Sequence, residues 1–140
     1  MVRSSPSAPD QAKEFKTLLV EDHVPFRHFF KKSLYKEFPK ILIEEATNGT
    51  EALEKVTSFV PDLIFMDIHL QDENGLELTR KIKNLHAYIE IVILTVFDLP
   101  EYRQAAKRYG VQDFIIKGLT PWKEIVALVK SISSKMGKPI

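Results

Sequence analysis

Four apolar residues in a row, Leu63–Met66, are the feature that most constrains the fold of this chain. Pro61 precedes the run, and Asp67 ends it before a polar loop that contains Gly75. An apolar run of this kind between turn residues is typical of a strand buried on both faces, as in a parallel sheet. Because ligands of open α/β sheets bind outside the carboxyl ends of the strands, Asp67 is the first candidate functional residue.

Short apolar strands alternate with amphipathic helices along the rest of the chain. Apolar and β-branched runs predict strands at residues 16–20, 41–46, 63–67, 91–95 and 114–116. Apolar residues at three- and four-residue spacing, in several cases after a proline, predict a helix behind each strand. This alternation favours a doubly wound α/β fold, in which helices cover both faces of a parallel sheet.

The helical spacing also predicts which residues are buried. In the helix that begins near Pro25, Arg27 and its basic neighbours lie opposite the aromatic residues. The expected buried faces comprise Phe26, Phe29, Phe30 and Leu34 in this helix, and Leu78, Ile82 and Leu85 in the third. Asn48-Gly49 predicts a turn, and Trp122 is either a core residue or an anchor for a partner.

Charge balance and the lack of cysteine exclude several classes of site. Lys and Arg number 20 against 19 Asp and Glu, so bulk charge gives no sign of nucleic-acid or membrane binding. The absence of cysteine excludes disulfides, thiol catalysis and cysteine metal sites. No apolar run approaches the roughly 20 residues of a membrane helix, and no signal-peptide core follows Met1, so we expect a cytoplasmic location.

The length of 140 residues fits a single domain. The beginning of the chain is rich in Ser, Pro and Ala, which predicts a disordered tail over residues 1–14. The rest of the chain, residues 15–137, is predicted to form one domain.

Residues suited to phosphoryl chemistry follow four of the predicted strands. Glu21-Asp22, Asp67, Thr95 and Lys117 stand at carboxyl ends, which share one edge of a parallel sheet. Carboxylates about 4 Å apart repel by about 4 kcal/mol per pair at an effective dielectric of about 20, and a hard cation such as Mg²⁺ relieves this repulsion. Lysine and hydroxyl groups suit phosphoryl oxygens, and Asp is a recognised nucleophile towards phosphorus.

Several motifs taken together are typical of one family. They are Val20-Glu21-Asp22, Pro61–Ile68, Asn74–Glu77, Ile93–Thr95 and Phe114–Lys117. In these motifs the chain resembles a response-regulator receiver domain of two-component (phosphorelay) signalling, over about residues 15–136. We therefore expect a (βα)₅ flavodoxin-like three-layer sandwich with strand order 2-1-3-4-5. The resemblance also implies a phosphorylated switch with slow self-dephosphorylation, not a turnover enzyme.

The resemblance implies a metal site and a phosphoacceptor. Asp67 would accept the phosphoryl group and also ligate Mg²⁺, or Mn²⁺ in its place. Asp22 would ligate the metal directly, Glu21 would act through a water molecule, and the backbone carbonyl of His69 would complete the protein ligands.

The resemblance further implies a switch and its partners. Thr95 would hydrogen-bond the phosphoryl group, Lys117 would pair with it, and Phe114 would be the switch aromatic. The phosphoryl donor would be a histidine kinase or a histidine phosphotransfer protein. The phosphorylated form would bind a partner or a second copy of the chain through the fourth helix, fifth strand and fifth helix. No direct nucleic-acid or membrane contact is expected, although a DNA-binding output domain would follow if the chain is part of a longer protein.

The chain departs from the family pattern at four positions. Glu21 replaces the commoner Asp but keeps its charge, and Gln71 replaces a Pro, which predicts a looser loop. Gly118 stands where Pro often follows the lysine, and a cis peptide costs about 3 kcal/mol more before Gly, so that loop is expected to differ. Val96 is bulkier than usual; we hypothesise that Val96 and Phe97 crowd the approach of water and prolong the phosphorylated state.

Two other functions compete with this interpretation. One is a phosphorylation-independent, receiver-like protein-interaction module, against which the intact Asp22, Asp67, Thr95 and Lys117 argue. The other is a phosphohydrolase resembling haloacid dehalogenases, which carry a second Asp two residues after the nucleophile. His69 occupies that position here.

The candidate residues also have purely structural interpretations. Asp67 could cap its loop, Thr95 could be an ordinary strand residue, and Lys117 could extend from the core to solvent. Their joint position at strand ends favours the functional interpretation. For Phe114 a plain core role stays open, because a buried aromatic ring does not by itself indicate a switch.

Overall fold

The fold is described by a computed structural model that covers residues 14–140. Apart from Glu14, the predicted tail over residues 1–14 lies outside the described residues. The strands are β1 (Lys16–Val20), β2 (Leu42–Ala46), β3 (Leu63–Asp67), β4 (Glu90–Thr95) and β5 (Asp113–Ile116). The helices are α2 (Val24–Glu37), α3 (Gly49–Ser58), α4 (Gly75–Leu85), α5 (Pro100–Arg108) and α6 (Trp122–Lys135).

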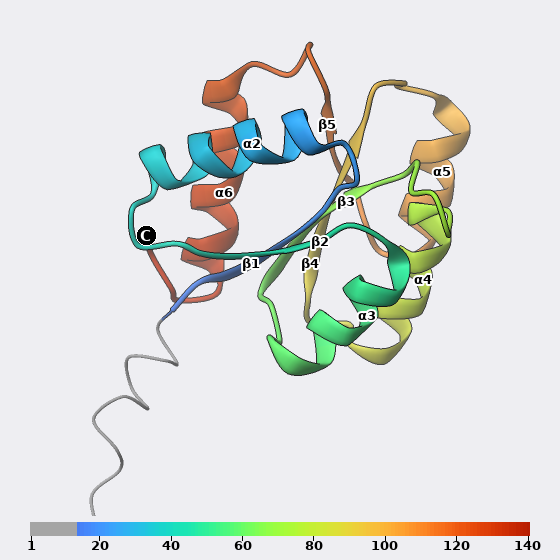
Figure 1. Cartoon of the computed structure of the whole chain (residues 1–140), viewed down its shortest axis with the longest axis horizontal. Coiled ribbons are helices and arrows are strands. Elements are labelled where there is room, and N and C mark those ends of the chain that lie inside the picture. Colours follow the sequence, from blue (N-terminus) through green and yellow to red (C-terminus); the bar gives the residue numbers. More distant parts are fainter. Residues whose placement is uncertain (1–13) are drawn as a thin grey trace, which may run out of the picture.

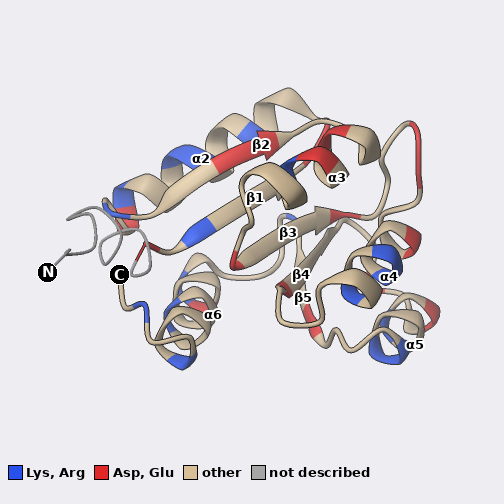
Figure 2. Ribbon diagram, turned by 90° about the horizontal axis from the view of Figure 1, so that it is seen from below, with Lys and Arg blue, Asp and Glu red and all other residues tan. Residues whose placement is uncertain are grey.

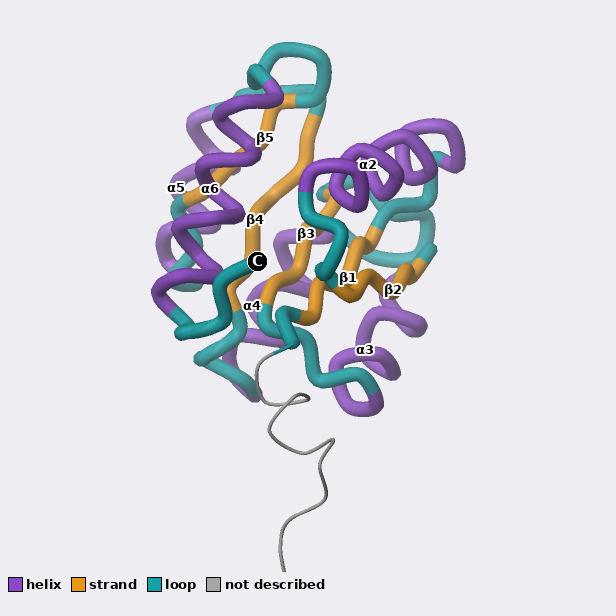
Figure 3. Tube along the Cα trace, turned by 90° about the vertical axis from the view of Figure 1, so that its left-hand side faces the viewer, coloured by secondary structure: helices purple, strands orange, loops and turns teal. Residues whose placement is uncertain are grey.

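The strands form one parallel sheet between two layers of helices. The strand order is β2-β1-β3-β4-β5, as predicted. Helices α2 and α6 cover one face and α3, α4 and α5 cover the other (Figures 1 and 3). Every residue of β3 is buried, which confirms that this strand lies at the centre of the molecule. The doubly wound three-layer fold is therefore confirmed.

Each face of the sheet has its own hydrophobic core because strand residues alternate between the two faces. In β1, Leu18 packs towards α3, α4 and α5, whereas Leu19 packs towards α2 and α6. Trp122 is partly buried in the second core, with its ring edge-to-face against Phe30 at a centroid distance of 6.1 Å. Trp122 is thus a packing residue of α6.

Two predictions of buried residues are wrong. Phe29 is 68% exposed and Leu85 is 72% exposed. In α2 the buried residues are Phe30 and Leu34, and successive helical residues are rotated by about 100°, so Phe29 lies off that face. Leu85 is the last residue of α4. At the predicted Asn48-Gly49 turn the chain bends at Asn48, but Gly49 is already the first residue of α3. Asn48 is the N-cap of that helix, and its side chain accepts a hydrogen bond from the Glu51 amide.

Ion pairs reach the edge strand β2 from both helix layers. Figure 2 marks the acidic stretch of β2 in red, with basic positions of α2 in blue beside it. From α2, Arg27 Nε and Lys31 Nζ lie 2.9 and 2.8 Å from the carboxylate oxygens of Glu45. From α3, Lys55 Nζ lies 2.7 Å from Glu44 Oε1. Charged side chains over an edge strand disfavour pairing with a second chain.

The strand register brings the strand-end residues together. Val20 of β1 pairs with Met66 of β3, so the residues that follow, Glu21 and Asp67, come next to each other. Asp67 in turn pairs with Leu94, the residue before Thr95. The polar residues at the carboxyl ends therefore meet at one edge of the sheet, as the sequence predicts.

Candidate functional site

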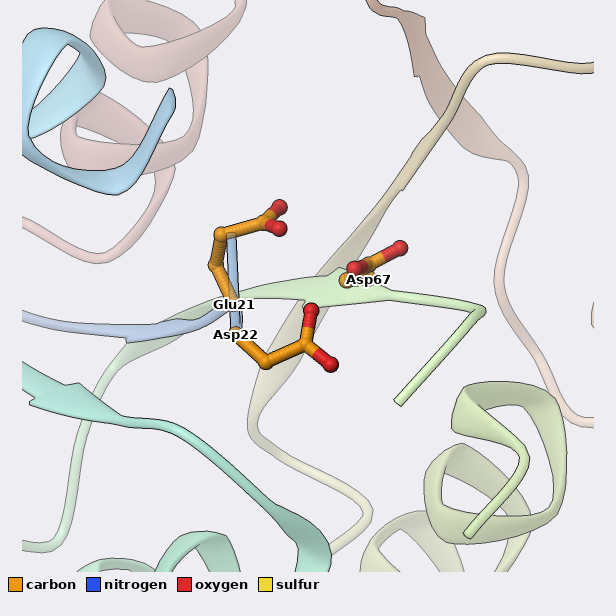
Figure 4. Close-up of side chains that lie close together, drawn as sticks. All are labelled: Glu21, Asp22 and Asp67. Atoms are coloured by element: carbon orange, nitrogen blue, oxygen red, sulfur yellow. The ribbon is translucent and has the colours of Figure 1, made fainter. Parts of the chain in front are cut away.

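Three carboxylates converge where β1 and β3 end. Glu21 and Asp22 follow β1, Asp67 ends β3, and one oxygen of each carboxylate lies within 4.8 Å of the other two. Figure 4 shows the three side chains side by side at these strand ends. Glu21 is fully buried and Asp67 nearly so, while Asp22 is half-buried. These three residues form the acidic cluster of the protein.

Lys117 is the cation of this cluster, but it lies closer to Glu21 than to Asp67. Its Nζ stands 2.7 Å from Glu21 Oε1 and 3.7 Å from Asp67 Oδ2. Lys117 reaches the site because β5 pairs with β4, and its amide donates to the carbonyl of Thr95 at 2.8 Å. One ammonium thus faces two buried carboxylates.

Glu21 has an unusual electrostatic environment. Burial raises the pKa of Glu21 to about 7, although the hydrogen bond from Lys117 opposes this and the charge of Asp67 adds to it. The His23 amide also donates to Glu21 Oε2 at 3.1 Å. The cluster brings three carboxylates together, and the Lys117 ammonium faces two of them, so the cluster fits a hard cation that prefers oxygen ligands.

Arg27 fixes the backbone of the acidic cluster, a role that sequence reasoning missed. Its Nη1 donates to the backbone carbonyl of Glu21 at 2.9 Å, while its Nε pairs with Glu45. The prediction placed Arg27 opposite the aromatic residues of its helix, and its side chain there is only 12% exposed. The helical pattern shows that Arg27 lies opposite the aromatic residues. It does not show that the Arg27 side chain folds back to contact the Glu21 carbonyl and the Glu45 carboxylate.

The segment after Asp67 returns to contact that residue. The His69 amide donates to Asp67 Oδ1 at 3.1 Å, and the Gly75 amide donates to the Ile68 carbonyl at 2.7 Å. His69 and Asn74 form an isolated antiparallel bridge across the base of the loop. The orientation of Asp67 is therefore set by its own loop.

Asp72 ties the same loop to another helix. Its carboxylate accepts hydrogen bonds from the amides of Gly49, at 2.9 Å, and Thr50, at 3.4 Å, in the first turn of α3. The hydrogen bond from the Gly49 amide holds the pKa of Asp72 below its usual value. Gln71 predicts a looser loop, but the neighbouring Asp72 supplies an anchor that the sequence does not reveal.

Thr95 and Phe114 lie on the neighbouring strands β4 and β5. Thr95 is fully buried, and its Oγ1 accepts a hydrogen bond from the Phe97 amide at 3.1 Å. Phe114 is half-buried against the core under α5, with the Arg103 guanidinium 4.6 Å above its ring centroid. Arg103 Nε in turn donates to Asp98 Oδ1 at 2.6 Å.

The loop after Lys117 contains no cis peptide. Within residues 14–140 every peptide bond is trans, and Gly118 has a φ of +81°. A left-handed glycine thus turns the chain where a Pro is common in the family that the sequence resembles. Across residues 14–140, no helix has the length and apolar character needed to cross a membrane.

Comparisons with known proteins agree with this geometry. A family model described as the response regulator receiver domain matches residues 17–130. The sensory transduction protein LytT of Enterococcus faecalis is 30% identical over 126 residues, which cover 88% of this chain and 50% of LytT. The transcriptional regulatory protein ResD of Bacillus subtilis is 32% identical over 123 residues, covering 88% of this chain and 50% of ResD. The chain spans about half the length of these two relatives.

A shorter relative and a solved structure match almost over their full lengths. The chemotaxis protein CheY of Thermotoga maritima is 29% identical over 115 residues, which cover 82% of this chain and 96% of CheY. The crystal structure of a two-component response regulator from Clostridium difficile has a TM-score of 0.80 and 31% identity, covering 88% of this chain and 98% of that one. The chain therefore belongs to the response regulator receiver domains of two-component signal transduction.

Proposed function

We propose that this receiver domain accepts a phosphoryl group on Asp67 and uses it to switch the binding of a partner. The observation that carries the proposal is the acidic cluster at the carboxyl edge of the sheet, with the Lys117 ammonium facing Glu21 and Asp67. The donor would be the phosphohistidine of a histidine kinase or of a histidine phosphotransfer protein. Asp67 is buried, with 4% exposure, at the edge of the sheet where ligands of open α/β sheets bind.

The acidic cluster would hold Mg²⁺, or Mn²⁺, during the reaction. Asp22 and Asp67 would be direct ligands, Glu21 would act through water, and the carbonyl of His69 would add a further oxygen. When bound, the metal supplies positive charge next to the phosphoryl oxygens. Two properties of the cluster suit such a metal: all of its donor atoms are oxygens, and its three carboxylates outnumber the one ammonium of Lys117 beside them.

The residues of the chain have separate tasks in the transfer. A carboxylate oxygen of Asp67 forms a bond to phosphorus as the bond from phosphorus to the imidazole nitrogen of the donor breaks. Lys117, already 3.7 Å from Asp67 Oδ2, would pair with the transferred group. The Thr95 oxygen accepts a hydrogen bond from the Phe97 amide, so the hydroxyl hydrogen of Thr95 is left to donate a hydrogen bond to the phosphoryl group.

The readout would be a change on the face made by α5, β5 and α6. Thr95 would move towards the phosphoryl group, and Phe114 would follow, which alters the surface near α5. A second copy of the chain or another protein would recognise the altered face. Slow hydrolysis of the aspartyl-phosphate would reset the switch, so the chain would not act as a turnover enzyme.

Intact-mass measurement after incubation with acetyl phosphate and Mg²⁺ tests this function. We expect a single phosphoryl adduct on the wild-type chain, lost in Asp67→Asn and in the presence of a chelator. An adduct that persists in Asp67→Asn would place the phosphoacceptor elsewhere. No adduct on folded, metal-saturated protein would favour a phosphorylation-independent interaction module.

A further inference from the structure

The ammonium of Lys117 lies over the face of an aromatic ring from α2. Lys117 Nζ is 4.6 Å from the ring centroid of Phe26, in addition to its contacts with Glu21 and Asp67. Only 15% of the Lys117 side chain is exposed. A cation held over a ring face and largely withdrawn from water is bound more strongly than one at an exposed site.

The Phe26 ring is itself held by a stack of aromatic residues. It lies nearly parallel to the Phe30 ring, with centroids 5.4 Å apart and an interplanar angle of 17°. Phe30 is buried and meets Phe65 and Trp122 edge-to-face, at 4.9 and 6.1 Å. Phe26 is therefore a fixed surface that extends from the core of the domain to the acidic cluster.

Packing alone does not confine Lys117 to the acidic cluster. Phe26 and Lys117 both line a hollow of about 690 Å³ between α2 and the segment that leads from β5 to α6. A long, flexible side chain beside an open space of this size can turn away from the site, at a gain in rotamer entropy. The ring face of Phe26 opposes that movement.

We propose that Phe26 is a positioning residue that holds the Lys117 ammonium between Glu21 and Asp67 for phosphoryl transfer. The proposal rests on the proposed function of Asp67 and Lys117. Phe26 acts through Lys117, so it does not contact the reacting atoms itself. Without the ring face, Lys117 spends less time within reach of Glu21 and Asp67.

The test compares Phe26→Leu, Phe26→Tyr and Phe29→Leu in the whole chain. Tyr keeps the ring face, and Phe29→Leu removes a neighbouring aromatic side chain of α2 that is 68% exposed and lines the same hollow. Thermal denaturation establishes that each variant is folded, and Phe26→Met, which keeps bulk without a ring, replaces Phe26→Leu if that variant does not fold.

Two measurements are made on each variant. The first is the NMR shift of the Lys117 ε-methylene protons, which the ring face moves upfield. We expect Phe26→Leu to lose this shift and Phe26→Tyr and Phe29→Leu to keep it. The second is the rate of adduct formation with acetyl phosphate and Mg²⁺. We expect about a tenfold loss in Phe26→Leu and less than about a twofold change in the other two variants.

Several outcomes would overturn the proposal. One is a wild-type rate in Phe26→Leu, and another is an equal loss in Phe26→Leu and Phe26→Tyr, which would indicate a structural role. If the wild-type chain forms no adduct, the proposed function fails. The ε-methylene shift then still decides whether Phe26 holds Lys117, because an unchanged shift in Phe26→Leu contradicts the placement itself.

Discussion

The carbonyl oxygen of Asp67 occupies the space in which a side chain on Gly75 would begin. A β-carbon on Gly75 would stand 2.0 Å from that oxygen and 2.8 Å from the Ile68 Cα. The first residue of α4 thus packs directly on the backbone of the proposed phosphoacceptor. Only glycine allows this approach, so the helix and the strand end are fixed relative to each other.

We predict that Gly75→Ala destabilises the domain by about 3 kcal/mol or more, because the clash involves backbone atoms that cannot move aside. Gly118→Ala is the matched control. Nothing lies within 4 Å of the β-carbon there, so only the left-handed conformation is disfavoured, at about 1–2 kcal/mol. Urea unfolding of both variants measures the difference. Equal losses would show that the contact with Asp67 relaxes without cost.

Acid should weaken the link between α2 and the edge strand. Burial alone would raise the pKa of Glu45, but the hydrogen bonds and charges of Lys31 and Arg27 outweigh it and hold that pKa below 4.5. A lowered carboxyl pKa contributes stability at neutral pH that is lost as the pH falls through the folded-state value. We therefore expect Glu45→Gln to lower the free energy of unfolding by about 1 kcal/mol at neutral pH, and this deficit to shrink as the pH falls through the lowered pKa of Glu45.

The control for that prediction is Glu44→Gln on the same strand. Glu44 pairs with Lys55, and both side chains are more exposed than that of Glu45. The expected loss is below about 0.5 kcal/mol. Urea unfolding at a series of pH values measures both variants, and a Glu45→Gln deficit that persists unchanged in acid would refute the assignment.

Mg²⁺ should stabilise the wild-type domain against unfolding through the acidic cluster. A ligand that binds only the folded state adds about 2.7 kcal/mol at a concentration 100 times its Kd. Asp22→Asn removes a proposed direct ligand, so we expect a weaker Mg²⁺ affinity and a smaller rise in Tm. Glu54→Gln, an exposed position on α3, should respond like the wild type. Calorimetric titration and thermal melts with and without Mg²⁺ measure these effects, and an unchanged affinity in Asp22→Asn would remove that residue from the site.

Val96 and Phe97 should lengthen the life of the aspartyl-phosphate. Both are more than half exposed, and the Phe97 ring stands edge-to-face with the His69 ring at 6.1 Å, next to the loop that follows Asp67. We predict that Val96→Ala loses its phosphoryl group several-fold faster than the wild type, because water reaches the site more easily. Loss of the adduct over time by intact mass is the measurement. Leu85→Ala, at another exposed apolar position, is the control, and slower loss in Val96→Ala would contradict the hypothesis.

The sheet and the meeting of the carboxylates could be predicted because they follow from local patterns. Leu63–Met66 is too apolar for any position but a central strand, and parallel strands end at one edge. The proximity of Glu21, Asp22 and Asp67 follows from that arrangement. Their roles in phosphoryl transfer, and the domain limits at residues 15 and 137, stay predictions.

Contacts that depend on rotamers and on second neighbours could not be predicted. The run of aromatic residues in α2 does not show that Phe30 is buried and Phe29 exposed. Adjacent aromatic residues cover a wide part of the helix surface, and the sequence does not show which part of it packs against the sheet. Likewise, the position of Lys117 at a strand end does not show whether its ammonium lies closer to Glu21 or to Asp67. The position of the ammonium depends on the side-chain torsions of Lys117 and on its contact with the Phe26 ring.

The hydrogen bonds of Asp72 join two segments that lie far apart in the sequence. The Gly49 amide that Asp72 binds comes 23 residues earlier in the chain. The first turn of α3 is therefore hydrogen-bonded to the loop after Asp67. The backbone amides of Gly49 and Thr50 join the sheet edge to a helix that contributes no residue to the acidic cluster.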